Sequence, residues 1–181
     1  MSCTLIAADL GKEGQLIDYL KDKAKLPEYS ITSVTPIRGM CTYDAFVMLK
    51  EKNYSKARDI ATRLRSESDS IIMNTITHCI EKGGFKRRKY TPLPLETLYF
   101  IHVDPEKMDD IVKSFRKIES VKEVRLLRGI FDGFARSTAA TSDEIKEMYK
   151  AITEVEGVRN ALELRVLKGS FNVENGKIKE L

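Results

Sequence analysis

Tryptophan is absent from this 181-residue sequence, and histidine and cysteine are scarce, with two and three residues respectively. Cys3, Cys41 and Cys79 are far apart and form no Cys-x-x-Cys pair, a pattern that indicates free thiols rather than a metal site or a disulfide framework. No apolar run approaches the roughly 20 residues that span a bilayer. The N-terminus lacks the basic segment and apolar core of a signal peptide. We therefore expect a cytoplasmic protein that uses no metal or other cofactor and does not enter a membrane.

Positive charge is concentrated in one short segment. The net charge is +4, yet residues 1–84 and residues 96–181 are each within one charge of neutrality. The segment between them has no acid and four consecutive cations, Lys86, Arg87, Arg88 and Lys89. Such a run can contact nucleic-acid phosphates in a salt-dependent way, and it is also typical of a solvated linker.

The same segment has the composition of a domain boundary. Gly83 and Gly84 precede the cations, and Pro92 and Pro94 follow them. Glycine frees the backbone and proline cannot donate to a strand ladder, so regular structure is expected to stop here. We predict a first unit at 1–84, a linker at 85–95, a second unit at 96–168 and a C-terminal tail at 169–181, where Asn-Gly predicts a hairpin.

The second half predicts the element order β-α-β-β-α-β. Its helices show apolar residues at i, i+3, i+4 and i+7, and the second of them begins with a capping box, Thr141 and Glu144. Asp104 and Pro105 form the expected N-cap and first turn of the first helix. The predicted strands cover residues 96–103, 121–127, 130–136 and 162–166.

The first half predicts the same order. Two apolar stripes at helical spacing mark its helices, one in residues 11–24 and one that contains Ala57, Ile60, Ala61 and Leu64. The predicted strands cover residues 4–9, 30–37, 43–50 and 71–80.

A turn motif aligns the two halves. Each half has Arg-Gly followed by an aromatic-Asp pair, and the two aromatic-Asp pairs lie 88 residues apart. A period this long indicates a duplicated domain rather than a solenoid. We therefore predict an α+β fold of two tandem ferredoxin-like βαββαβ units, of the dimeric α/β-barrel type, packed sheet against sheet as an intrachain pseudo-dimer.

Residues 97–168 resemble the effector-binding and assembly domain of the Lrp/AsnC regulators. The resemblance rests on the element order, on the turn Gly129-Ile130-Phe131-Asp132 and on the segment at 155–161, which contains Gly157 and Val158. The first half resembles the same domain more faintly. The helix-turn-helix that usually precedes this domain has no counterpart in residues 1–60, which alternate strands and helices, so direct DNA binding by that route is not expected.

The resemblance implies a regulator-related protein that senses a small molecule such as an amino acid, or that assembles subunits, and that is not an enzyme. It also implies that the protein forms a homo-oligomer, or that it assembles with DNA-binding relatives and modulates them. The implied ligand-binding residues are those of the two turns: Arg38, Gly39, Tyr43 and Asp44 in the first half, and Arg128, Gly129, Phe131 and Asp132 in the second.

The chemistry of these turns suits such a ligand. Glycine lets backbone N–H groups approach a carboxylate, arginine can clamp it, and aspartate can accept from an amino group. The alternative is that Asp44 and Asp132 stabilise their own turns through hydrogen bonds to the backbone.

Evidence for catalysis is sparse in the sequence. There is no phosphate-binding glycine loop and no nucleophile elbow. Both histidines, His78 and His102, fall in predicted strands. Alternation places His102 with Leu98 and Phe100, which favours a packed or interface histidine over a general base. A second alternative is an enzyme like the haem-pathway decarboxylases, distant relatives of this domain, and it would use His102 with Arg125 or Arg128.

Overall fold

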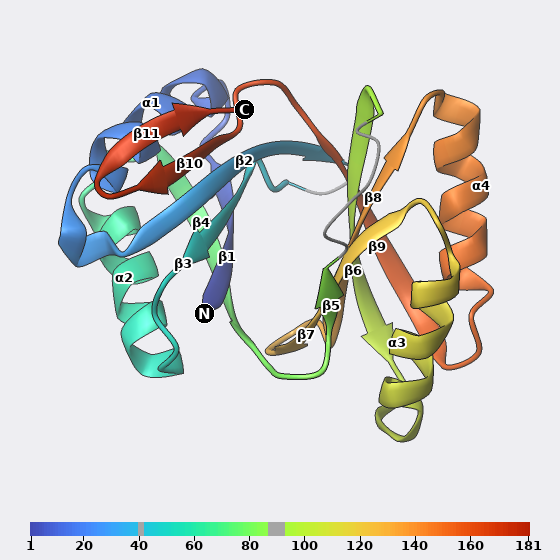
Figure 1. Cartoon of the computed structure of the whole chain (residues 1–181). Helices are drawn as coiled ribbons and strands as arrows, with labels where there is room; N and C mark the ends of the chain where they lie inside the picture. The colour runs from blue at the N-terminus through green and yellow to red at the C-terminus, as the bar shows by residue number, and fades with distance from the viewer. Residues whose placement is uncertain (40–41, 87–92) are drawn as a thin grey trace. The chain divides into compact units, whose positions relative to one another are not determined.

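The computed structural model describes residues 1–39, 42–86 and 93–181, which form two compact units. Unit 1 contains Met1–Ile80 together with Leu167–Leu181, and unit 2 contains Glu81–Val166. Within each unit, strands and helices follow the order β-α-β-β-α-β (Figure 1). The predicted α+β class and antiparallel ferredoxin-like order are therefore confirmed for each unit.

Unit 1 has a six-stranded antiparallel sheet in the order β11-β10-β2-β3-β1-β4. Its elements are β1 (Ser2–Ala8), α1 (Glu13–Ala24), the 3₁₀ turn η1 (Pro27–Tyr29), β2 (Ile31–Gly39), β3 (Ala45–Leu49), α2 (Tyr54–Ser66), β4 (Ile72–Ile80), β10 (Phe171–Glu174) and β11 (Lys177–Glu180).

Unit 2 has an antiparallel sheet in the order β7-β8-β6-β9, and a short strand, β5, pairs with β7. Its elements are β5 (Phe85–Lys86), β6 (Leu95–Val103), the 3₁₀ turn η2 (Pro105–Lys107), α3 (Met108–Lys117), β7 (Val121–Arg128), β8 (Gly133–Ala139), α4 (Ser142–Thr153) and β9 (Val158–Val166).

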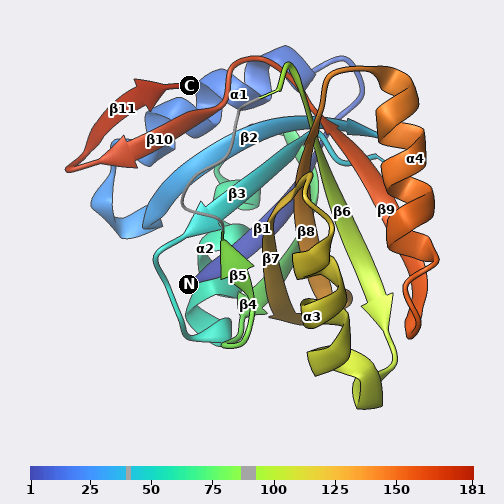
Figure 2. The same cartoon turned by 45° about the vertical axis from the view of Figure 1, so that its right-hand side comes forward.

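In each unit both helices cover one face of the sheet, because the apolar stripes predicted from the sequence pack against alternate strand residues (Figures 1 and 2). In unit 2, α3 buries Ile111, Val112 and Phe115 against strand residues such as Tyr99 and Ile101. In unit 1, α1 and α2 do the same against β1, β2 and β3. The helix-covered face is the apolar core of each unit.

Several predicted boundaries differ from those observed. The strand expected at 130–136 begins at Gly133, since residues up to Asp132 form the turn. Asp104 does not cap the helix after β6 through its side chain; its carboxylate instead pairs with Arg159, and the chain enters α3 through η2. Thr141 caps α4 as predicted, accepting the Glu144 N–H at 3.2 Å.

The C-terminal tail belongs to unit 1 rather than to the unit that precedes it in the sequence. It forms the β10–β11 hairpin, whose turn residues Asn175 and Gly176 have positive φ values of 51° and 73°. Strand β10 pairs with β2, and the Phe171 ring is fully buried in the unit 1 core. Burial of this ring fixes the tail on the first sheet.

Two further expectations concern cysteines and membranes. In the described part of the chain, Cys3 and Cys79 are free thiols, and burial raises the pKa of the Cys3 thiol. Cys41 lies outside the described residues. Over the described ranges, no helix has both the length and the apolar character needed to cross a bilayer.

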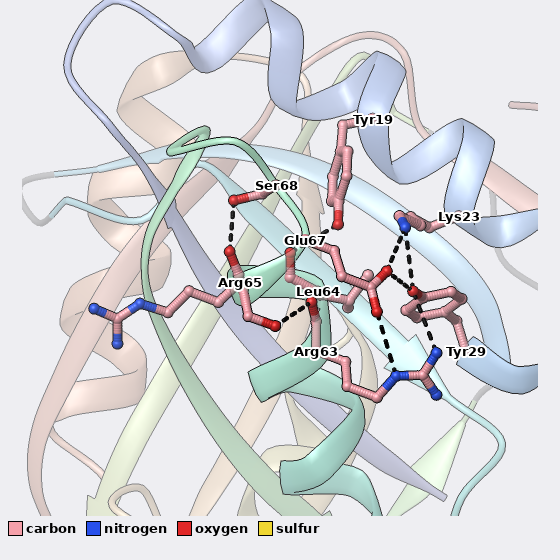
Figure 3. Close-up of polar contacts among 9 residues, drawn as sticks. Tyr19, Lys23, Tyr29, Arg63, Leu64, Arg65, Glu67 and Ser68 are labelled. Atoms are coloured by element: carbon pink, nitrogen blue, oxygen red, sulfur yellow. Dashed lines mark hydrogen bonds and ion pairs between the residues drawn. The ribbon is translucent and has the colours of Figure 1, made fainter.

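A polar network joins the helices of unit 1 at the carboxyl end of α2 (Figure 3). The Glu67 carboxylate accepts from Lys23 Nζ at 2.6 Å and from the Tyr29 hydroxyl, and it lies 3.5 Å from Arg63 Nε. Tyr29 is almost completely buried, and the cations of Lys23 and Arg63 lie over its ring. The hydrogen bonds from Lys23 and Tyr29 lower the pKa of Glu67 to about 2. The network therefore holds α1, η1 and α2 together.

Glu67 is expected to make unit 1 sensitive to strong acid. Because its folded pKa lies below the ordinary value of 4.5, its contribution to stability is complete above pH 4.5 and is lost as the pH falls towards 2. Glu67→Gln should lower stability at neutral pH and remove this part of the acid dependence. Denaturant unfolding between pH 2 and 7 measures the effect. Glu147→Gln, at an exposed position on α4, is the control; an unchanged acid profile in Glu67→Gln would contradict the assignment.

Candidate functional site

The predicted aromatic-Asp turn of unit 2 is held by its aspartate. One carboxylate oxygen of Asp132 accepts the Val103 N–H at 2.9 Å. The Asp132 N–H donates to the Ile101 carbonyl, and the Asp132 carbonyl accepts the Leu127 N–H. Three hydrogen bonds thus fasten the turn to β6 and β7.

Unit 1 repeats the same three hydrogen bonds. Asp44 accepts the Ala8 N–H at 2.9 Å, donates from its own N–H to Ile6, and accepts the Ile37 N–H on its carbonyl. Burial raises the pKa of Asp44. In both units the carboxylate satisfies a buried strand N–H rather than its own turn, a structural task that needs no ligand.

The other predicted turn residues have different surroundings. Arg128 is 80% exposed and forms an ion pair with Glu81 at 2.7 Å, and Gly129 beside it is exposed. In unit 1, Arg38 and Gly39 are exposed and Tyr43 is partly buried. Phe131 packs its ring against other aromatic rings, those of Phe100 and His102. The turn of unit 2 therefore has a chemically distinct neighbour, His102.

His102 lies on the sheet face of unit 2 opposite α3 and α4, here called the far face. Strand alternation places it there with Leu98 and Phe100, whereas Tyr99 and Ile101 point into the helix-covered core. The ring of His102 lies 5.0 Å from that of Phe131, and its Nδ1 lies 3.8 Å from an Asp132 carboxylate oxygen. The imidazole is 38% exposed, so an oriented, accessible imidazole lies beside a carboxylate and an aromatic ring.

Two arginines share the far face with His102. Strand register places Arg125 opposite Phe134, which in turn lies opposite Phe100, and places Arg136 opposite Leu98. Each arginine has an acidic partner: Arg125 Nε lies 2.7 Å from Glu123, and Arg136 lies 3.0 Å from Glu96. The far face thus combines buried aromatic rings with one imidazole and two guanidinium groups that are partly exposed.

The equivalent positions of unit 1 carry different side chains. The matched hydrogen bonds and strand registers align Ala7 with His102, Thr35 with Arg125 and Met48 with Arg136. An imidazole and two guanidinium groups in unit 2 therefore correspond to uncharged side chains in unit 1. The histidine on that face of unit 1, His78, lies on β4 opposite Cys3 and is fully buried, so the partly exposed imidazole beside the turn is a feature of unit 2.

The remaining predicted residues do not join this site. Lys86 ends β5, whereas Arg87, Arg88 and Lys89 lie outside the described residues. Groups of three or more possible metal ligands are absent from the described ranges. A cavity of about 580 Å³ in unit 1 lies between α2 and β4 and contains none of the predicted residues; its lining includes Asp9, Arg65 and Met73.

Comparison with known proteins identifies the fold through solved structures. No family model and no curated protein sequence matches the chain. The siroheme decarboxylase NirDL is similar with a TM-score of 0.72 at 8% identity, over 92% of this chain and 71% of that one. Chlorite dismutase from Candidatus Nitrospira defluvii gives 0.57 at 10% identity, over 92% and 90%. A proposed monooxygenase from Lactobacillus acidophilus gives 0.53 at 12% identity, over 99% and 94%.

These neighbours correct the functional interpretation of the sequence. The identification of an Lrp/AsnC effector domain is wrong, as are the inferred role in transcription regulation and the conclusion that the chain is not an enzyme. The error has a physical cause. The aromatic-Asp pair marks a way of fastening a turn to neighbouring strands, which both units use, and so it indicates a fold rather than a function.

Sequence reasoning found His102 but assigned it a packing role. Its alternation with Leu98 and Phe100 correctly indicated the face, and the set of His102 with Arg125 was assembled for the decarboxylase alternative. Arg136 and Phe134 were missed because they reach the site through the pairing of β8 with β6. Comparing the two halves position by position, with Ala7 aligned to His102, is the signal that could have found the site.

Proposed function

We propose that unit 2 binds an iron tetrapyrrole of the siroheme class on its far face and that the chain is an enzyme of the decarboxylase type. The observation that carries the proposal is His102, an accessible imidazole beside Phe131 and Asp132. The likeness in fold to a siroheme decarboxylase, including a complex with an iron-uroporphyrin III analogue, supports the choice of ligand.

The side chains of the far face fit the chemistry of such a substrate. A tetrapyrrole is a flat aromatic ring with carboxylate side chains, and it needs aromatic contacts and cations. Arg125 and Arg136 supply the cations. The Nε atom of Arg136 is buried and has no hydrogen-bond acceptor among the described residues.

The same residues can serve decarboxylation. Loss of CO₂ from a carboxylate side chain breaks a carbon–carbon bond and leaves the electron pair on carbon, which must then take up a proton. A protonated imidazole beside the reacting group can donate it. The Nδ1 atom of His102 lies 3.8 Å from an Asp132 oxygen that already accepts the Val103 N–H, so Nε2 is the ring nitrogen proposed to face a substrate.

Titration with iron-uroporphyrin III tests the proposal. We expect wild-type protein to change the absorbance spectrum of the iron compound, and His102→Ala to weaken binding at least about tenfold, or about 1.4 kcal/mol. Metal-free uroporphyrin is the internal control: it keeps the carboxylates but has no iron, so its binding should depend on His102, Arg125 and Arg136 in the same way as that of the iron compound. A spectrum that does not change on addition of protein would contradict the proposal.

Activity is tested separately with siroheme. Mass spectrometry should show loss of CO₂ with wild-type protein, and His102→Gln should retain binding better than turnover because glutamine cannot donate the proton. Binding of siroheme without any loss of CO₂ would reject the enzymatic part and leave the binding part intact.

We also propose that the two units arose by duplication and correspond to the two subunits of a dimeric relative. Support comes from the three hydrogen bonds that Asp44 and Asp132 make to equivalent strand positions. An experimental structure in which a near-twofold rotation relates the units would agree with this proposal, and unrelated orientations would contradict it.

A further inference from the structure

Unit 2 has a second feature that the proposed function does not use, a basic surface on α3 and β5. It consists of five exposed cations: Lys82, Lys86, Lys113, Arg116 and Lys117. Lys113 pairs with Asp110 at 2.9 Å. Within the described ranges, Lys82, Lys86 and Lys117 form no ion pair. The surface therefore has uncompensated positive charge.

A cavity of about 450 Å³ opens on the basic surface. It is lined by Lys113, Arg116 and Lys117, together with Asp109, Val112 and Gly83. Gly83 has a φ of +113°, and a side chain there would meet Leu126. The neighbouring Gly84 packs so closely on β7 that a Cβ would lie 2.1 Å from the Val124 carbonyl oxygen. Both positions next to the cavity therefore require glycine.

An aromatic ring and a guanidinium group lie together at this site. The guanidinium carbon of Arg116 lies 5.1 Å from the centre of the Phe85 ring, which is itself partly buried against the unit 2 core. Such stacking holds the guanidinium plane in a fixed orientation. A planar base can stack on a platform of this kind whatever its sequence.

The amino-acid sequence has further positive charge directly after β5. Strand β5 ends at Lys86, and the next residues of the sequence are Arg87, Arg88 and Lys89, followed by Tyr90. Cations in linear series suit a linear polyanion better than a compact one, because each charge can contact a successive phosphate. The acidic residues on the same helix face, Asp109 and Asp110, leave a positive excess.

We propose that this basic surface binds single-stranded nucleic acid, with phosphates along the lysines and a base at the Arg116–Phe85 platform. An unpaired base can reach the platform and cavity, whereas the bases of a duplex are stacked inside it. Sequence preference is not expected, since the surface offers charge and stacking. This activity is independent of His102 and of the far face.

Fluorescence anisotropy with a labelled thymidine oligonucleotide of about 20 residues tests the proposal, because one binding site covers roughly 4–16 nucleotides. Wild-type protein should bind with a Kd in the micromolar range at about 50 mM salt and weaken steeply towards 200 mM. The triple variant Lys82→Ala/Lys86→Ala/Lys117→Ala should bind at least about tenfold more weakly. The slope of log Kd against log salt concentration should fall by about 2, because each of the three lost single-strand phosphate contacts contributes roughly 0.7.

Matched variants separate this surface from general positive charge. Lys146→Ala/Lys150→Ala/Lys177→Ala removes three exposed lysines elsewhere and should leave binding within about twofold of wild type. Arg116→Lys keeps the charge but loses the planar stack, and it should weaken binding while the salt slope stays the same. Equal losses in both triple variants would overturn the proposal, as would a duplex that binds as tightly as the single strand. Competition by polyglutamate as strong as that by unlabelled oligonucleotide would also overturn it.

Discussion

Lowering the pH from 6.5 to about 4 is expected to destabilise the protein by about 3 kcal/mol through one side chain, His78. This histidine is fully buried on β4, in register with Cys3 on β1. Burial disfavours the charged imidazole and lowers the pKa of His78 from 6.5 to about 4. Between these two values the unfolded chain binds a proton that the folded chain does not, so stability falls as the pH falls.

Denaturant unfolding at a series of pH values measures this dependence. In His78→Gln the loss between pH 6.5 and 4 should shrink by most of the expected 3 kcal/mol. His102→Gln should leave the dependence in place, since His102 is partly exposed. Asp44 acts in the opposite direction because its pKa is raised, and the comparison between variants cancels that contribution. Equal acid dependence in wild type and His78→Gln would reject the assignment. The pH range of the His78 effect lies mostly above that of Glu67, whose contribution to stability is lost below pH 4.5.

Replacing either turn aspartate by alanine is expected to cost about 1–3 kcal/mol, because each substitution leaves a buried strand N–H without an acceptor. Asp44→Ala exposes this deficit at Ala8, and Asp132→Ala at Val103. Asp44→Asn and Asp132→Asn keep a carbonyl oxygen at the same place and should retain most of the stability. Thermal or denaturant unfolding of the four variants measures the difference.

The two aspartates also form a matched pair for function. Both alanine variants should lose similar stability, but only Asp132→Ala should alter the binding of iron-uroporphyrin III, since only Asp132 lies beside an imidazole. Ala7 occupies the equivalent position in unit 1. If the two variants bound iron-uroporphyrin III equally well, binding beside Asp132 would be contradicted. The stability measurement would still test the structural role of both aspartates.

The sequence predicted the local elements well because they depend on short-range patterns. The apolar stripe of α2 and the capping box at Thr141 and Glu144 need only neighbouring residues to be recognised. The Asn175-Gly176 turn is equally local. Asp104 shows where a local pattern was not enough. Its carboxylate was expected to cap the following helix, but it pairs with Arg159, 55 residues away in the sequence.

The repeated element order and the repeated turn were visible in the sequence, but the role of the turn was not. Two turns with the same residues suggested two sites for one ligand. The structure shows that Asp44 and Asp132 perform the same backbone task in both units. The difference between the units, Ala7 against His102, lies on another strand and becomes relevant only when the strands are paired.

For the C-terminal tail, too, the sequence predicted the local structure but not its place in the fold. Its hairpin was predicted from Asn-Gly alone, but nothing in residues 169–181 says which sheet receives it. Burial of Phe171 beside β2 decides this.

By itself, the sequence determined most of the secondary structure and its order, because periodicity and turn chemistry act over a few residues. Only the tertiary structure decided which side chains share a face: Arg125, Phe134, Phe100 and His102 come from three strands, and strand register alone brings them together. For that reason the sequence was enough to recognise a turn that occurs in both halves. The candidate site beside the second turn could be recognised only from the fold.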